Sequence, residues 1–204
     1  MLQLILLRVT FRIWLGIFGL LLFGSLASCS SLDAPTVGLA GDDHLIVPGE
    51  RVGPIRLGMS EDDLLKLGKP SSTEPNPLWT QENGTIPAIY YSYFSLIDVW
   101  VERSTHRVVK IVVGNDGHCG GYHTTEGVTC GSYISNILGA YGNEDFLRKD
   151  DFGPKALWTT YFNYTHSPST VTEFNFHPRF AAMDVRPGDT VLYIELKEKR
   201  FENR

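Results

Sequence analysis

Two cysteines and two histidines lie within 13 residues of one another near the middle of the chain: His118, Cys119, His123 and Cys130. Four nitrogen and sulfur donors are the ligand set of a structural zinc ion. However, the spacing H-C-x3-H-x6-C is not one of the typical structural zinc spacings, and adjacent ligands rarely point to one centre. In an oxidising compartment an even pair of cysteines favours a disulfide, and the three intervening glycines let the loop close. We therefore expect a Cys119–Cys130 disulfide, with free thiols and a metal site as the alternatives.

A third cysteine, Cys29, follows a segment with the order of a secretory signal. Arg8 and Arg12 precede an apolar run of 11 residues, 13–23, and no acidic residue occurs before Asp33. Such a run is too short to span a bilayer, which takes about 20 apolar residues. The sequence therefore predicts a signal peptide over residues 1–28.

The tetrapeptide Leu26-Ala27-Ser28-Cys29 resembles the lipobox of bacterial lipoproteins. This resemblance implies that a diacylglycerol is attached to the Cys29 thiol, that a signal peptidase cuts between Ser28 and Cys29, and that the new amine is acylated. Several acyl chains on one residue give stable anchoring without a spanning helix. Ser30, rather than Asp, after the cysteine implies the periplasmic side of the outer membrane, with the inner membrane and the cell surface as alternatives. An ordinary signal peptide followed by a chance cysteine is the other interpretation.

The composition limits what the mature chain can bind. Removing residues 1–28 takes away two arginines and no acid, which leaves 16 basic and 23 acidic residues and a net charge of −7. This charge argues against binding nucleic acid or anionic lipid through bulk electrostatics. We expect no cofactor.

Capping residues and hydrophobic periodicity predict the helices and strands of the chain. Residues 29–48 are rich in Ser, Asp, Gly and Pro, and we expect a flexible tether there. Ser60, three acids and Leu64 predict a short helix that ends at Gly68, and Ser132 with apolar residues at helical spacing predicts another over 133–141. Six β-branched or aromatic runs predict strands; they cover 88–94, 96–102, 107–113, 157–164, 171–176 and 190–197.

The two halves are similar in sequence at an offset of 73 residues, which aligns Gly58 with Gly131, Ile55 with Val128 and Leu64 with Ile137. This similarity predicts an α+β protein of two tandem repeats, 49–116 and 117–204, each a short helical segment packed on a three- to four-stranded antiparallel sheet. The segment IRLGMSEDDLLKLGKP resembles the opening of SmpA/OmlA-type (BamE-like) outer-membrane lipoprotein domains. Two such units in tandem resemble the architecture of β-lactamase-inhibitor proteins.

No catalytic constellation is recognisable, because the chain lacks a G-x-S-x-G elbow, an HExxH motif and a phosphate-binding glycine loop. The carboxylate pairs Asp62/Asp63 and Asp150/Asp151 are typical of a helix start and of a loop. We therefore predict a protein that is not an enzyme but a binding or scaffold module with a protein partner in the envelope, acting in outer-membrane assembly or as an inhibitor-like binder. Aromatic side chains either form the binding surface or fill the core: Trp79, Tyr91, Tyr93, Trp100, Trp158 and Tyr161. The alternative function is a periplasmic hydrolase or small-molecule-binding lipoprotein.

Overall fold

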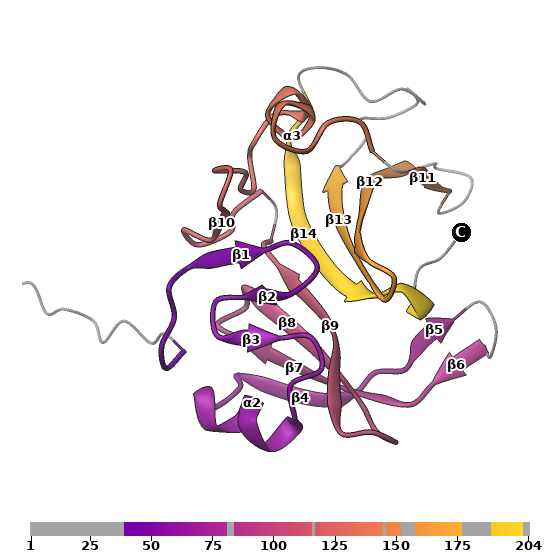
Figure 1. The fold of residues 1–204 in the computed structure, drawn as a ribbon. Helices are drawn as coiled ribbons and strands as arrows, with labels where there is room; N and C mark the ends of the chain where they lie inside the picture. Colours follow the sequence, from indigo (N-terminus) through magenta and orange to yellow (C-terminus); the bar gives the residue numbers. More distant parts are fainter. Residues whose placement is uncertain are drawn as a thin grey trace, which may run out of the picture. The chain divides into compact units, whose positions relative to one another are not determined.

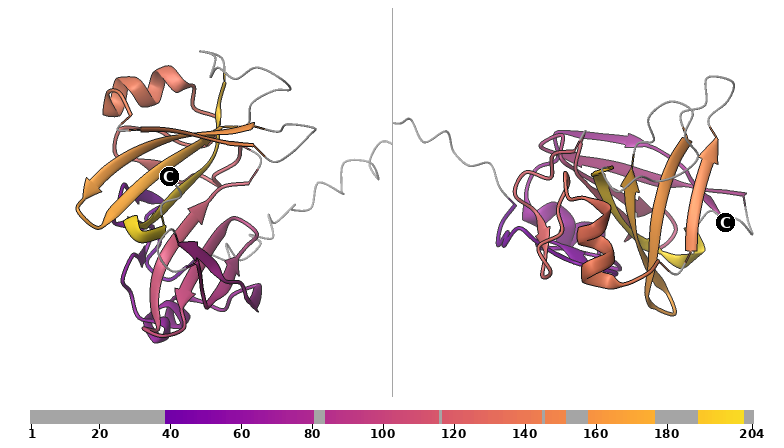
Figure 2. Two further views of the ribbon diagram at one scale, coloured as in Figure 1. Left: turned by 90° about the vertical axis from the view of Figure 1, so that its right-hand side faces the viewer. Right: turned by 90° about the horizontal axis from the view of Figure 1, so that it is seen from above.

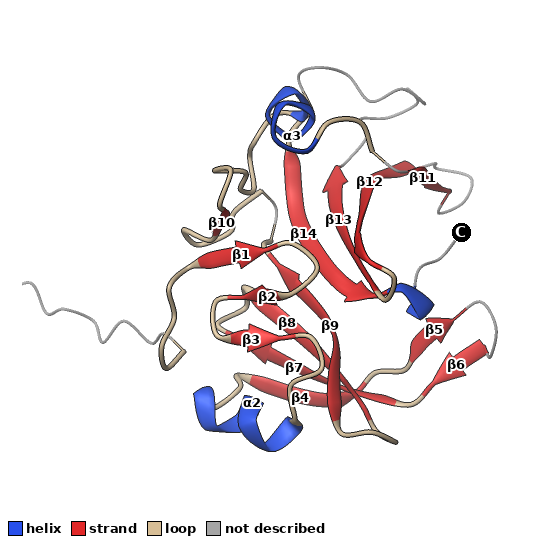
Figure 3. Ribbon diagram, viewed as in Figure 1, coloured by secondary structure: helices blue, strands red, loops and turns tan. Residues whose placement is uncertain are grey.

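The computed structural model describes residues 39–80, 84–115, 117–144, 146–151, 158–176 and 189–201. The described chain is mostly β (Figures 1 and 3). Its two α-helices are α2 (Glu61–Leu67) and α3 (Ile134–Tyr141), and a 3-10 turn, η1 (Lys199–Phe201), ends it. The signal peptide, Ser28 and Cys29 lie outside the described residues.

An antiparallel sheet of eight strands forms the centre of the fold. In spatial order its strands are β11 (Phe146–Asp151), β12 (Trp158–Ser167), β13 (Thr170–Phe176), β14 (Val191–Glu198), β9 (Arg107–Val113), β8 (Ile97–Glu102), β7 (Ala88–Tyr93) and β4 (Ser72–Pro75). The strands β9 and β14 join its two halves, with Val113 opposite Ile194 and Ile111 opposite Leu196.

The prediction of two α+β repeats, each with its own sheet, is therefore wrong. The expected boundary between residues 116 and 117 divides a sheet that is continuous across it, since β9 precedes that point in the chain and β14 follows it. The β-branched and aromatic runs predicted six of these eight strands, whereas β4 and β11 were not predicted. These runs carried no information on which strand edges would pair.

Two smaller β elements accompany the main sheet. A four-stranded sheet has the order β10 (His123–Thr124), β1 (Leu45–Val47), β2 (Arg51–Val52) and β3 (Ile55–Arg56), in which β1 and β10 are parallel. A separate hairpin joins β5 (Leu78–Thr80) to β6 (Gly84–Ile86). Strand β1 falls in the predicted tether, and no strand was predicted at the positions of the other five.

The folded part begins earlier than the sequence indicated. Leu39 is buried against Gly68 at the end of α2, and Ile46 in β1 is fully buried. Residues 39–48 thus belong to the fold, although the predicted tether extended to residue 48.

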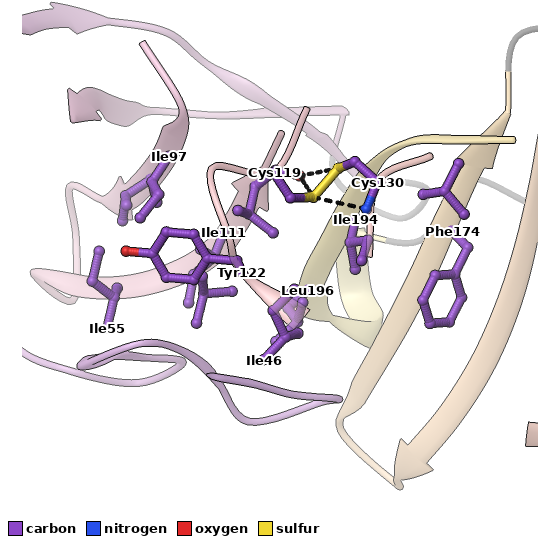
Figure 4. Packing of buried hydrophobic residues seen from close by; sticks show 14 of the residues in the cluster. Ile46, Ile55, Ile97, Ile111, Cys119, Tyr122, Cys130, Phe174, Ile194 and Leu196 are labelled. Atoms are coloured by element: carbon purple, nitrogen blue, oxygen red, sulfur yellow. Dashed lines mark hydrogen bonds between the residues drawn. A yellow bond between two sulfur atoms is a disulfide. The ribbon is translucent and has the colours of Figure 1, made fainter. Parts of the chain in front are cut away.

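The main apolar core lies between the small sheet, the helices and one face of the main sheet (Figure 4). Figure 2 shows these elements from two further sides. Ile46, Val52 and Ile55 of the small sheet are fully buried there with Val99 and Ile111 of the main sheet. Burying side chains of this kind contributes roughly 1.5–3 kcal/mol each. This face of the sheet is closed by the protein itself, so any surface for a ligand on the sheet must lie on its other face.

The N-cap residue of α2 is the predicted one, whereas the N-cap of α3 is one residue later than predicted. Ser60 accepts a hydrogen bond from the Asp63 amide, as predicted for the N-cap of α2. At α3 the N-cap is Tyr133 rather than Ser132, and the Asn136 side chain accepts from the Tyr133 amide. Asp150 and Asp151 lie in strand β11 and not in a loop.

Candidate functional site

The second face of the main sheet carries polar and aromatic side chains where the first carries the core. Cross-strand partners share a face, so the register places Glu74, Tyr90, Trp100 and Lys110 in one row across β4, β7, β8 and β9. A second row continues through Asp98 towards β14 and β13. We call this surface the polar face; it consists of Glu74, Tyr90, Asp98, Trp100, Lys110, Glu173, Glu195 and Lys197.

Four charged side chains form a chain of ion pairs at the centre of the polar face. Lys110 Nζ lies 2.8 Å from a Glu195 oxygen, and Lys197 Nζ lies 3.0 Å from Glu195 and 2.7 Å from Glu173. Glu173, Glu195 and Lys197 are all buried. A buried charge persists only with a partner of opposite sign, because desolvation of an unpaired ion costs several kcal/mol. Because positive and negative side chains alternate, each of the four ionised groups has a partner of opposite sign.

The neighbouring Lys110 and Lys197 determine the protonation state of Glu195. Burial alone would raise the pKa of its carboxyl, but the positive charges of Lys110 and Lys197 outweigh that effect and lower the pKa to about 2. A carboxylate with a lowered folded-state pKa contributes stability that is fully present above the unfolded value of about 4.3 and is lost as the pH falls through the folded value.

We therefore expect the Glu195→Gln variant to be less stable than wild type at pH 7, and the difference to shrink as the pH falls from about 4.3 towards 2. Chemical denaturation at a series of pH values measures this difference. Glu50→Gln at an exposed turn is the matched control and should keep the wild-type profile. A Glu195→Gln effect that does not change with pH would contradict the assignment.

The part of the polar face on β7 and β8 is less buried and carries an aromatic pair. The Tyr90 and Trp100 rings meet edge to face with centroids 5.1 Å apart, and Lys110 Nζ lies 4.8 Å from the Trp100 ring centroid. The Tyr90 hydroxyl donates to Asp98 at 2.7 Å. Burial and the nearby carboxylates of Asp98 and Glu74 raise the pKa of Tyr90, so the phenol stays a hydrogen-bond donor.

The hairpin β5–β6 carries an aromatic residue whose side chain is mostly exposed to water. Leu78 is buried in a second small cluster with Val109 and Phe201, against which Trp100 packs. Trp79 is next to Leu78 along the strand and therefore points away from that cluster, with 68% of its surface exposed. Exposed tryptophan is uncommon in monomeric proteins and is enriched among the residues that dominate protein interfaces.

The aromatic residues considered from the sequence thus divide into two groups. Trp79 is exposed and Trp100 is half-buried on the polar face, whereas Tyr91 and Tyr93 are buried in the core. The side chains of Trp158 and Tyr161 lie outside the described part.

A histidine–carboxylate contact that sequence reasoning missed lies on the core side of the sheet. His106 Nδ1 is 2.6 Å from Glu61 at the start of α2, and the Tyr91 hydroxyl donates to the other Glu61 oxygen. Burial opposes ionisation of Glu61, but these two hydrogen bonds outweigh it and lower the carboxyl pKa. The contact joins the β8–β9 turn to the start of α2.

The Cys119 and Cys130 sulfur atoms lie at bonding distance inside the core, with their Cα atoms 5.2 Å apart (Figure 4). Gly114 has a positive φ of 110°, and a Cβ atom there would lie only 2.4 Å from the Cys130 sulfur, which explains the glycine. Both cysteines are engaged with each other and not with His118 or His123. Among the described residues no group of three or more His, Cys, Asp or Glu side chains could hold a metal ion.

No helix in the part of the chain that the structure describes is long and apolar enough to cross a bilayer. No family model, curated protein or solved structure matches the chain. The resemblances to lipoproteins, to SmpA/OmlA-type domains and to β-lactamase-inhibitor proteins therefore stay predictions from the sequence.

Proposed function

We propose that this chain is a lipid-anchored envelope lipoprotein that acts as a non-enzymatic protein-binding module. The binding part of the proposal depends chiefly on one observation. The main sheet buries one face in the core, while its other face carries half-exposed Tyr90 and Trp100 together with Asp98. Rigid aromatic side chains among polar groups on a sheet are typical of protein interfaces.

The anchoring part depends on Leu26-Ala27-Ser28-Cys29 and on the position at which the fold begins. Leu39, the first described residue, is already buried and lies ten positions after Cys29. A chain of that length reaches at most about 35 Å. Lipidation would thus hold the sheet close to one membrane surface, where a partner in the same envelope is met at high effective concentration.

The binding proposal is tested by capture of partners from detergent-solubilised envelopes. Wild type is expected to recover a stoichiometric protein partner, and Trp79→Ser is expected to lose most of it, because truncating an anchoring aromatic costs about 2 kcal/mol or more of binding energy. Tyr133→Ser is the matched control, since Tyr133 is also exposed, at 54%, but lies at the N-cap of α3. Equal recovery of the partner by wild type and by Trp79→Ser would show that Trp79 is not part of the interface. If wild type recovers no stoichiometric protein partner, the binding function is contradicted.

A further inference from the structure

The open end of the polar face combines two carboxylates with two aromatic rings. Glu74 lies directly opposite Tyr90 across the β4–β7 pair, and Tyr90 lies directly opposite Trp100 across the β7–β8 pair. Asp98, two residues before Trp100, accepts the Tyr90 hydroxyl. We call these four residues the acidic–aromatic corner: Glu74, Tyr90, Asp98 and Trp100.

The corner is accessible within the described structure, since Glu74 is exposed and the other three residues are half-buried. Among the described strands β4 is the edge of the main sheet, and none of them pairs with its outer side. This access distinguishes the corner from the centre of the polar face, where Glu173, Glu195 and Lys197 are buried.

The two carboxylates of the corner have no cationic partner among the residues that the structure describes. Within the described ranges neither Glu74 nor Asp98 takes part in an ion pair, and the nearest cation of the row, Lys110, is already bound by Glu195 at 2.8 Å. Both carboxylates act electrostatically on the same Tyr90 hydroxyl. A ligand that approaches this end of the sheet therefore meets negative charge.

The aromatic rings favour an organic cation over a metal ion. The Trp100 ring already carries the Lys110 ammonium at 4.8 Å from its centroid, so the electron-rich ring contributes to holding positive charge within the fold. An arginine guanidinium can stack on an aromatic ring and pair with a carboxylate at the same time, which a hydrated metal ion cannot.

We propose that the acidic–aromatic corner receives an arginine or lysine side chain of a basic segment on the protein partner. This inference rests on the proposed function and adds the chemistry of the partner to it. Nucleic acid and anionic lipid are disfavoured as occupants, because both are negatively charged, as are the corner and the mature chain as a whole.

The test uses the full-length protein in detergent and a defined probe, an acetylated peptide of alternating glycine and arginine with three arginines. A glycine–glutamate peptide of equal length is the negative control. Calorimetric titration is made with wild type, with Glu74→Gln/Asp98→Asn, and with Glu50→Gln/Glu144→Gln. Both double variants remove two negative charges, but Glu50 lies in the β1–β2 turn and Glu144 follows α3. Asp98→Asn keeps an acceptor for the Tyr90 hydroxyl.

The arginine peptide should bind wild type in a salt-dependent manner, and neutralising the corner should weaken binding about tenfold. The Glu50/Glu144 variant should change the affinity less than twofold. No binding to wild type, or an equal loss in both double variants, overturns the inference. If envelope capture depends on Trp79 but is unchanged by Glu74→Gln/Asp98→Asn, the binding function stands and the basic partner is excluded.

Discussion

Lys197→Met should destabilise the protein by about 3–5 kcal/mol, the largest effect that we expect from a single substitution. Lys197 is buried and lies 2.7 Å from Glu173 and 3.0 Å from Glu195. Methionine fills a similar volume but carries no charge, so both carboxylates lose the cation between them. Urea denaturation at pH 7 measures the change as a lower midpoint with little change in slope.

The matched control is Lys66→Met on helix α2. Lys66 also has a carboxylate partner, Asp63 at 2.7 Å, but both side chains are mostly exposed to water. Exposed ion pairs are screened by solvent, so this substitution should leave the midpoint almost unchanged. Equal effects of Lys66→Met and Lys197→Met would show that the central charges are not buried as described.

Replacing both core cysteines should have the second largest effect. For a loop closed by Cys119 and Cys130, 11 residues apart, the loss of the disulfide costs about 3 kcal/mol through the entropy of the unfolded chain. Both cysteines are buried, and the loop that they close carries β10 and leads towards α3. The variant Cys119→Ala/Cys130→Ala should therefore unfold at a markedly lower temperature than wild type.

The measurement is a thermal melt of the variant beside wild type with and without reductant, together with alkylation and mass spectrometry. Reduced wild type should approach the stability of the variant, and the peptides that contain Cys119 and Cys130 should be alkylated only after reduction. Alkylation of both peptides without reductant in the denatured protein would establish free thiols.

Local patterns predicted the individual strands because the alternation of residues such as Ile97, Val99 and Val101 has a direct physical cause in burial of one face. Strand β9 has the bounds that its sequence indicated, Arg107–Val113. The pairing of β9 with β14 was missed, because strands far apart in the chain meet through exposed backbone edges that any sequence provides. Strand β1 was missed because Leu45–Val47 is a short apolar run within a polar segment.

The candidate site was less predictable than the fold. Glu173, Glu195 and Lys197 alternate with apolar residues and have the pattern of a solvent-facing row, whereas the structure buries all three as ion-paired groups. Trp79 and Trp100 could be named from the sequence, but their different exposure follows from the β5–β6 hairpin packing against Trp100. The contact of His106 with Glu61 joins residues 45 positions apart and leaves no local signal.

Everything proposed for this protein in the envelope depends on Cys29, and Cys29→Ser tests it most directly. Cells that express wild type or Cys29→Ser are labelled with radioactive palmitate and then separated into membrane and soluble fractions. We predict that wild type is labelled, shortened to begin at Cys29 and recovered with the membrane, and that Cys29→Ser is unlabelled and either uncleaved or soluble. Unchanged labelling, processing and membrane recovery of Cys29→Ser would contradict the lipid anchor.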